Sequence, residues 1–332
     1  MKRSILILIL FFVFSPISFA KEKVRIGWVY AMANAPIVIA EKKGLFENEG
    51  VEVEARSFTS GPILHQALAA GQLDMAYIGS PPVYHWYSRG LESQILAKVN
   101  YGQAAVIVRK DSGINSLKDL KGKKIAGVKK GSGMDVLLRG YVLGEAAGLV
   151  PDKDIRVIPM PPGNMGPSVE NNVVDAAFIW EPFTSQYELR GNTKVIFDMN
   201  EAVPNYPWYV VMAPPEVLKT KRDAITRVLR AHKKAVEFLN SAPDAGNDII
   251  ADAFKMDKVE GPNGKIFSGA DVVAQARKRI GWEWNITPAD NEFIQRLMTY
   301  SHELRFIKKP LTPKQLVDAT LLRDATTMEA GL

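Results

Sequence analysis

The feature that most constrains this chain is a regular alternation of short apolar runs with amphipathic segments over its first two thirds. The apolar runs are rich in valine, isoleucine and aromatic residues, as buried strands are. Eight runs have this character: 24–29, 51–54, 75–78, 105–108, 125–128, 155–158, 176–179 and 209–212. Segments with apolar residues at helical spacing lie between them: 36–46, 62–70 and 132–147. Strands that alternate with helices predict an α/β fold with mostly parallel sheets and flanking helices.

From Arg222 onward the pattern changes to helix alone. Apolar residues recur near every 3.6 residues in the segment 222–239. Further helical segments are expected at 244–254, 270–279, 290–304 and 313–328. No clear strand accompanies them, so we expect a helical C-terminal part that has no sheet of its own and packs on an earlier lobe.

Two breaks divide the chain into two lobes. The stretch 110–124 is polar and contains turn residues, and the stretch 203–207 contains two prolines. Crossings of the chain near 109–111 and 205–209 would then form a hinge between the lobes. The two lobes are residues 21–109 plus 209–332 and residues 110–208.

The first twenty residues have the form of a secretory signal peptide. Lys2 and Arg3 precede an apolar run over 5–14, and Ser18 to Ala20 has the small-x-small form of a cleavage site. The apolar run is too short to span about 30 Å of hydrocarbon. We expect cleavage after Ala20 and export, most simply to a periplasm. An uncleaved N-terminal anchor is the alternative interpretation.

Composition narrows the function further. The formal charge of +6 becomes +4 without Lys2 and Arg3, and no basic run with interleaved aromatic residues is present, so we expect no nucleic-acid partner. The chain has no cysteine, which excludes disulfides, thiolate metal sites and cysteine nucleophiles. The four histidines are scattered, and no zinc-hydrolase, serine-hydrolase or Walker motif is present. We therefore expect no enzyme activity, no catalytic residues, no metal and no cofactor.

Three predicted strand-to-helix junctions have the character of ligand-binding loops. Ligands of parallel α/β sheets bind beyond the carboxyl ends of strands, where helix N-termini offer free N–H groups to an anion. Capping alone is the alternative interpretation of each junction, and the prolines at 81 and 82 remove two donors beside Ser80. The candidate substrate-binding residues at these junctions are Tyr30, Met32, Asn34, Gly79, Ser80, Gly131, Ser132, Gly133 and Asp135.

Aromatic residues near strand ends add four further candidates. Trp180 and Glu181 follow the predicted strand 176–179, where the indole could line a ligand and the carboxylate could meet an ammonium group. A core tryptophan with a hinge-side glutamate is the alternative. Tyr206 and Trp208 lie at the second crossing and either contact the ligand or pack the hinge.

Four segments resemble a known family: 25–46, 71–82, 117–126 and 175–182. They are similar to segments of the periplasmic substrate-binding proteins of nitrate, sulfonate and taurine ABC transporters. The resemblance implies a two-lobe, type II-like periplasmic binding protein that closes on a small-molecule ligand. Such a protein hands its ligand to an ABC permease in the inner membrane, which works with an ATPase. The resemblance also implies that backbone amides at the Gly79–Ser80 and Gly131–Ser132 loops hold the acid group.

The resemblance leaves the solute open. We expect a monomer that captures a small anionic organic solute of the sulfonate or taurine type between its lobes. A taurine ligand would need Glu181 or Asp135 to meet its ammonium group. Nitrate, bicarbonate, an aromatic carboxylate and a pyrimidine precursor are alternative solutes. An exported enzyme that uses the same cleft, or a sensory partner of a membrane receptor, would be a different class of function.

Overall fold

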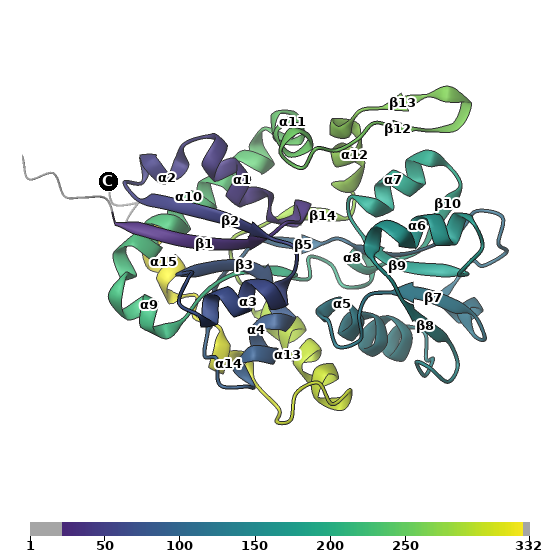
Figure 1. Ribbon diagram of the computed structural model, residues 1–332, viewed down its shortest axis with the longest axis horizontal. Helices are drawn as coiled ribbons and strands as arrows, with labels where there is room; N and C mark the ends of the chain where they lie inside the picture. Colours follow the sequence, from purple (N-terminus) through teal and green to yellow (C-terminus); the bar gives the residue numbers. More distant parts are fainter. Residues whose placement is uncertain (1–21, 328–332) are drawn as a thin grey trace, which may run out of the picture.

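The computed structural model describes residues 22–327 and divides them into two lobes, each built on one five-stranded sheet (Figure 1). The expected signal peptide, residues 1–20, lies outside the described residues. Within residues 22–327, no helix combines the length and the apolar character needed to cross a bilayer. The predicted α/β class, with helices that flank the sheets, is confirmed.

The first sheet has the strand order β2-β1-β3-β11-β4. β1 (Lys23–Val29) pairs in parallel with β2 (Glu52–Phe58) and with β3 (Met75–Gly79). β11 (Tyr209–Ala213) pairs antiparallel with β3 and with β4 (Gln94–Lys98). β3 is buried along its whole length because helices cover both faces of the sheet (Figure 1).

The second sheet repeats this arrangement in the order β10-β6-β9-β7-β8. β7 (Lys124–Gly127) pairs in parallel with β8 (Arg156–Pro159) and with β9 (Ala176–Trp180). β6 (Ala104–Arg109) pairs antiparallel with β9 and with β10 (Thr193–Asp198). In each sheet three parallel strands therefore end at one edge, and residues from both of these edges line one cavity.

Helices flank the first sheet on both faces. They are α1 (Ala35–Lys42), α2 (Leu45–Asn48), α3 (Gly61–Ala69), α4 (Ser80–Tyr87), α9 (Pro215–Thr220), α10 (Arg222–Ser241) and α11 (Pro243–Ala253). α10 carries apolar residues at steps of three and four, so that Ile225, Val228, Leu229 and Val236 are all buried on one face. α10 packs against α1, which closes one side of the sheet.

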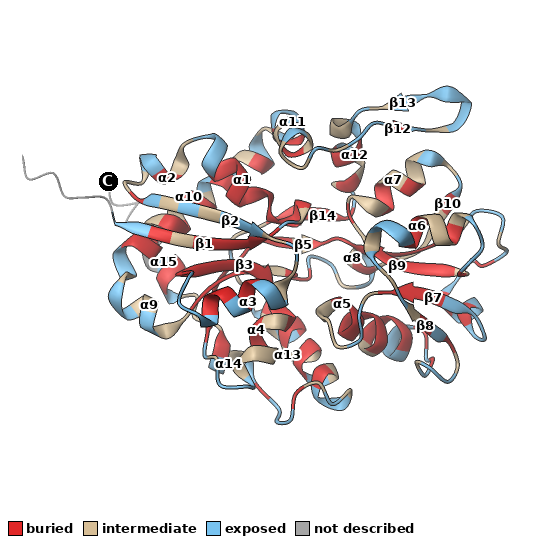
Figure 2. Ribbon diagram, viewed as in Figure 1, coloured by how far each residue is buried: buried red, intermediate tan, exposed pale blue. Residues whose placement is uncertain are grey.

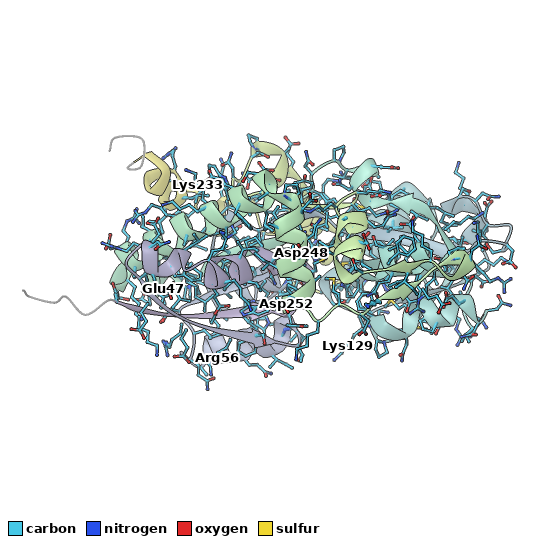
Figure 3. All side chains as sticks on the ribbon, turned by 90° about the horizontal axis from the view of Figure 1, so that it is seen from above. Glu47, Arg56, Lys129, Lys233, Asp248 and Asp252 are labelled. Atoms are coloured by element: carbon cyan, nitrogen blue, oxygen red, sulfur yellow. The ribbon has the colours of Figure 1, made fainter. Side chains whose placement is uncertain are left out.

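The helices of the second lobe are shorter. They are α5 (Gly133–Val136), its continuation as a wider π-type helix over Leu137–Ala146, α6 (Pro162–Glu170), α7 (Phe183–Arg190) and α8 (Met199–Ala202). Figure 2 shows the central strands of both sheets buried between their helices, with exposed and half-buried residues on the edge strand β2 and on the outer helices and loops. Charged side chains are spread over the outer surface, where Glu47, Arg56, Lys129 and Asp252 are all exposed (Figure 3).

The first crossing between the lobes lies at Gly102–Gln103, which corrects the boundary that we expected near 109–111. β6 belongs to the second sheet because it pairs with β9 from Ala104 to Val108. Gly102 has a φ of 70°, and a Cβ at this position would lie 2.0 Å from the carbonyl oxygen of Arg279, so the crossing requires glycine. The polar segment that suggested a boundary is a loop inside the second lobe. The chain returns to the first lobe through α8 and the residues that precede β11.

The C-terminal part is mostly helical, as predicted, with α12 (Gly269–Ala276), α13 (Pro288–Glu303), α14 (Pro313–Leu316) and α15 (Thr320–Thr327). It also contains short strands, although we expected none: β12 (Val259–Glu260), β13 (Ile266–Phe267) and β14 (Ile280–Trp282). β12 and β13 form a hairpin, and β14 pairs with β5 (Asn100–Gly102) of the first crossing. Runs of two or three residues are too short to show a strand pattern in sequence.

This C-terminal part contacts both lobes, although we expected it to pack on the first. α13 packs against α4 of the first lobe and also against α5 and the helix 137–146 of the second. α12 packs against α7 of the second lobe. An ion pair between Arg296 of α13 and Glu145 adds to the contact with the second lobe.

Arg279, immediately before β14, binds three carboxylates of the second lobe. Its Nη1 lies 3.1 Å from Oε1 of Glu181 and 2.7 Å from Oε2 of Glu188, and its Nε lies 3.1 Å from Oδ2 of Asp198. Its carbonyl oxygen accepts a hydrogen bond from the N–H of Gln103 at 2.9 Å. One arginine thus connects the C-terminal part, the first crossing and the second lobe.

We predict that Arg279→Met lowers the free energy of unfolding by about 3–5 kcal/mol, because buried carboxylates would lose their cation. Urea denaturation measures this loss. Arg190→Met is the control: Arg190 pairs with Glu170 at 3.7 Å and is partly exposed, and such pairs contribute less than about 1 kcal/mol. Equal losses in the two variants would contradict the structural role of Arg279.

Candidate functional site

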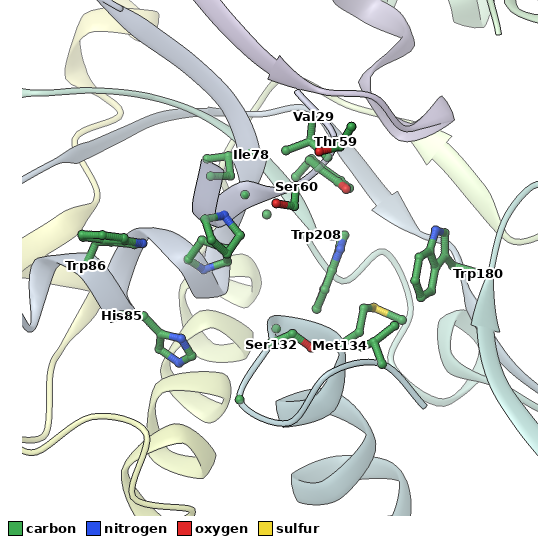
Figure 4. Close-up of a pocket in the computed structure, with 18 of the residues that line it drawn as sticks. Val29, Thr59, Ser60, Ile78, His85, Trp86, Ser132, Met134, Trp180 and Trp208 are labelled. Atoms are coloured by element: carbon green, nitrogen blue, oxygen red, sulfur yellow. The ribbon is translucent and has the colours of Figure 1, made fainter. Parts of the chain in front are cut away.

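A cavity of about 420 Å³ lies between the lobes, at the carboxyl ends of the parallel strands of both sheets. We call it the first compartment. The first lobe lines it with Val29, Thr59 to Pro62, Ile78, Gly79, Pro82, His85, Trp86, Arg89, Trp208 and Tyr209. The second lobe lines it with Val128, Gly131 to Met134, Pro162 and Trp180. In the view of Figure 4, Trp86 and His85 lie to the left of the compartment, and Trp208 and Trp180 lie to the right.

The charge in this compartment is positive. Among the 20 residues that line it, Arg89 is the one residue with a permanent charge, and there is no aspartate or glutamate. The guanidinium of Arg89 lies 5.7 Å from the ring centre of Trp86. Burial and the neighbouring Arg89 lower the pKa of His85 to about 4, so His85 is neutral near pH 7. Its Nε2 lies 3.1 Å from Oγ of Ser301, which holds the ring in place.

Helices begin at the same compartment from both lobes. Gly61 is the first residue of α3, and the preceding Ser60 makes no capping bond through its side chain. Gly133 and Met134 are the first residues of α5. The first N–H groups of a helix have no acceptor within that helix, so Gly61, Gly133 and Met134 can donate to an anion.

Several amides that we expected to hold the ligand are bonded within the protein instead. The N–H of Ser80 donates to the carbonyl oxygen of Trp208 at 2.9 Å. The N–H of Gly131 donates to Oδ2 of Asp135 at 2.8 Å, and that of Ser132 to the carbonyl oxygen of Lys129 at 3.1 Å. These internal bonds fix the shape of the two loops. After the second loop Gly133 and Met134 remain as donors, whereas Pro81 and Pro82 after Ser80 have no N–H.

A second compartment of about 360 Å³ adjoins the first. The two share five lining residues: Val29, Thr59, Pro162, Trp180 and Tyr209. The first lobe adds Tyr30 to Met32 and Phe254 to Asp257 to the second compartment. The second lobe adds Glu181 to Phe183 and Gln186. The interlobe cleft is therefore longer than either compartment alone.

The structure brings most of the predicted site residues to this cleft. Those that line the first compartment are Gly79, Gly131, Ser132, Gly133, Trp180 and Trp208. Those that line the second compartment are Tyr30, Met32, Trp180 and Glu181. Those that line neither compartment are Asn34, Ser80, Asp135 and Tyr206.

The predicted residues that lie outside the cleft form hydrogen bonds or ion pairs with other residues of the protein. Tyr206 is buried, and its hydroxyl accepts the N–H of Ala104 at 3.1 Å, so it packs the crossing. Nδ2 of Asn34 donates to the carbonyl oxygen of Val29 at 2.7 Å. Asp135 is fully buried, and its Oδ1 lies 2.6 Å from Nε of Arg139.

Glu181 lines the second compartment, yet its carboxylate already has partners. Oε2 accepts the N–H of Ser185 at 3.1 Å, and Oε1 accepts from Nη1 of Arg279 at 3.1 Å. Burial raises the pKa of this carboxyl to about 7, because the loss of water outweighs the attraction of Arg279. Its chemistry is therefore that of a buried structural partner of Arg279.

Two groups of residues that line the first compartment were not among the predicted site residues. Thr59 to Pro62 follow β2, which we expected to end at Glu54 rather than at Phe58. The Ser-Gly-Pro sequence at residues 60–62 resembles the three strand-to-helix junctions that we predicted as ligand-binding loops. His85, Trp86 and Arg89 come from α4 and the turn after it, which had no strong helical pattern in the sequence.

Two lobes that enclose a cleft at the carboxyl ends of their sheets have the architecture of two-lobed periplasmic binding proteins. The chain belongs to the NMT1-like family, whose model matches residues 19–253. A protein of Brucella abortus (strain 2308) that is named as a binding protein is 32% identical over 304 residues, 88% of each chain. The family resemblance predicted from the sequence is confirmed.

Two further similar proteins agree with the assignment of the chain to this family. A protein of Bacillus subtilis (strain 168) that is named as an aliphatic sulfonates-binding protein is 28% identical over 318 residues, which cover 92% of this chain and 88% of that one. The periplasmic aliphatic sulphonate binding protein of Escherichia coli has the same fold, with a TM-score of 0.76 and 22% identity. That match covers 92% of this chain and 100% of the other. The predicted periplasmic binding protein fold is thereby confirmed.

We predict that Glu181→Gln flattens the pH dependence of stability between about pH 4.5 and about pH 7. In this range the unfolded chain has lost the Glu181 proton, whereas the folded protein keeps it because the pKa is raised to about 7. The contribution of Glu181 to stability therefore falls as the pH rises. Asp198, whose pKa burial also raises, and Glu188 are unchanged in this variant.

Urea denaturation across this pH range measures the effect. Glu170→Gln is the control, since Glu170 lies on the same lobe and contacts Arg190 rather than Arg279. A pH profile of Glu181→Gln that runs parallel to that of the unmodified protein would contradict the prediction.

Proposed function

We propose that this protein is the exported solute-binding component of an ABC importer and captures a small organic anion of the sulfonate type. The names of the relatives support a binding role rather than an enzymatic one. The likeness of the fold to a periplasmic binding protein supports a periplasmic location and an inner-membrane permease, with its ATPase, as the partner. The protein acts as a monomer and releases its ligand unchanged.

The observation that carries the proposal is the charge of the first compartment. Arg89 supplies a cation, no lining residue supplies a carboxylate, and helix starts from both lobes supply N–H donors. Each hydrogen bond to a charged group contributes about 1.5–3 kcal/mol. Four such bonds near the upper value contribute about 12 kcal/mol, which leaves the roughly 8 kcal/mol of micromolar binding after a cost of about 4 kcal/mol for ordering.

The contact between the lobes supports a closing motion. Gly133 at the start of α5 faces Pro81 in α4, so that a Cβ on residue 133 would lie 2.8 Å from Cγ of Pro81. Rotation about the two crossings would separate these residues and open the cleft. Closure brings the donors of both lobes to one ligand and removes it from water.

The partners of the predicted carboxylates favour a simple sulfonate over taurine. Glu181 is bonded to Arg279 and Asp135 to Arg139, so neither has a free charge for an ammonium group. Nitrate, bicarbonate, aromatic carboxylates and pyrimidine precursors are the alternative solutes, and the same binding experiment separates them.

We predict that organic sulfonates raise the melting temperature of the protein, because a ligand at 100 times its Kd stabilises by about 2.7 kcal/mol. Arg89→Gln should weaken sulfonate binding about tenfold or more through the loss of a charged partner. Arg156→Gln, at an exposed position on β8, is the control and should bind as the unmodified protein does. If only uncharged compounds stabilise the protein, the proposed anion site is wrong.

We predict that Gly133→Val weakens binding by about tenfold while the protein still folds, because the added methyl groups push Pro81 away and hold the lobes apart. Isothermal titration with the best sulfonate measures the affinity. The control is Gly163→Val at the start of α6, where a Cβ meets nothing within 4 Å. If Gly133→Val binds the sulfonate as tightly as the unmodified protein does, the contact between residue 133 and Pro81 plays no part in closing the lobes.

A further inference from the structure

The second compartment continues the aromatic lining of the first, which contains Trp86, Trp180, Trp208 and Tyr209. Its walls are mostly aromatic and apolar, and the two lobes supply them from opposite sides. The rings of Tyr30 and Phe254 lie 5.1 Å apart on the first lobe, and those of Trp180 and Phe183 lie 6.3 Å apart on the second. Met256 and Pro182 add to the apolar lining.

The second compartment carries mixed charge: Lys255 is the one cation among its lining residues, and Asp257 and Glu181 are acidic. Lys255 and Asp257 have opposite charges and lie two residues apart in the same loop. The carboxylate of Glu181 is bonded to Arg279. Arg89, by contrast, lines the first compartment and not the second. The first compartment therefore has only positive charge among its lining residues, and the second, with two acidic residues beside Lys255, is the less favourable place for an acid group.

The cleft has more room than a minimal ligand fills. At roughly 30 Å³ for each water-sized group, methanesulfonate with its five heavy atoms occupies at most about 150 Å³. The first compartment alone has about 420 Å³ and the adjoining second about 360 Å³. A ligand as small as methanesulfonate would leave both aromatic walls of the second compartment without a partner.

The geometry points to an elongated ligand with two ends: an acid group in the first compartment and a planar aromatic body that passes Trp180 and Tyr209 into the second. Trp180 and Tyr209 line both compartments, so such a ligand would lie against both rings. Aromatic rings prefer tilted or offset contacts with centres about 4.5–7 Å apart, which the two walls allow from both sides. This inference rests on the proposed function, and it specifies the substrate class of the same site.

Isothermal titration with a series of sulfonates tests the inference. The probes are methanesulfonate, benzenesulfonate, octane-1-sulfonate and biphenyl-4-sulfonate, which share one head group. We expect affinity to rise along the aromatic series and biphenyl-4-sulfonate to bind at least about tenfold more tightly than methanesulfonate. Octane-1-sulfonate should bind more weakly than biphenyl-4-sulfonate, because a flexible chain loses more conformational freedom.

Two variants locate the aromatic body in the second compartment. Phe254→Ala removes one wall, and Gln186→Trp fills the space from the second lobe without removing a core residue. Each should weaken biphenyl-4-sulfonate about tenfold and leave methanesulfonate within about twofold. Phe267→Ala is the matched control, because Phe267 lies on the β12–β13 hairpin and lines neither compartment.

The outcomes separate the two proposals. If methanesulfonate binds as tightly as biphenyl-4-sulfonate, or if neither Phe254→Ala nor Gln186→Trp distinguishes them, the elongated ligand is wrong while the anion site stands. If octane-1-sulfonate binds as tightly as biphenyl-4-sulfonate, the aromatic body is wrong. If no sulfonate of any length binds, the proposed function itself fails.

Discussion

The arrangement of the whole molecule depends on holding the carboxyl ends of two separate sheets opposite each other, and Arg279 is central to this. It is bonded to Glu181 and Glu188 at the end of β9 and in α7, and its own backbone holds the first crossing at Gln103. Burial of one arginine with several carboxylates is costly unless the geometry satisfies all of them. The network therefore favours one relative position of the C-terminal part and the second lobe.

The strand ends of the two sheets face each other across the cleft, and this arrangement accounts for the chemistry of the cleft. Loops after parallel strands from both lobes meet there, and helices begin in them, so N–H groups converge without any dedicated side chain. The Gly131 and Ser132 amides stabilise their own loop, and the first N–H groups of α5 have no acceptor within the helix. Arg89 then adds charge at one end, while aromatic residues from both lobes cover the other.

Much of the fold was predictable from local pattern. All eight predicted strands are present, because buried strands are short continuous apolar runs. β4 and β10, which were missed, lie at sheet edges and have polar residues at both ends. The site was predictable where a loop followed a recognised strand, as at Gly131. It was not predictable at Trp86 or Arg89, because these residues reach the cleft only through the position of α4 on the sheet.

The sequence by itself determined the fold class, the family and several loops that line the cleft, because strand and helix periodicities and glycine-rich junctions are properties of neighbouring residues. Tertiary structure alone decided which lobe β6 joins, that Tyr206 packs the crossing, and that Asp135 and Glu181 are bonded to arginines. These outcomes depend on residues far apart in the chain. A side chain is free for a ligand only when no distant partner satisfies it, and the order of residues does not show that partner.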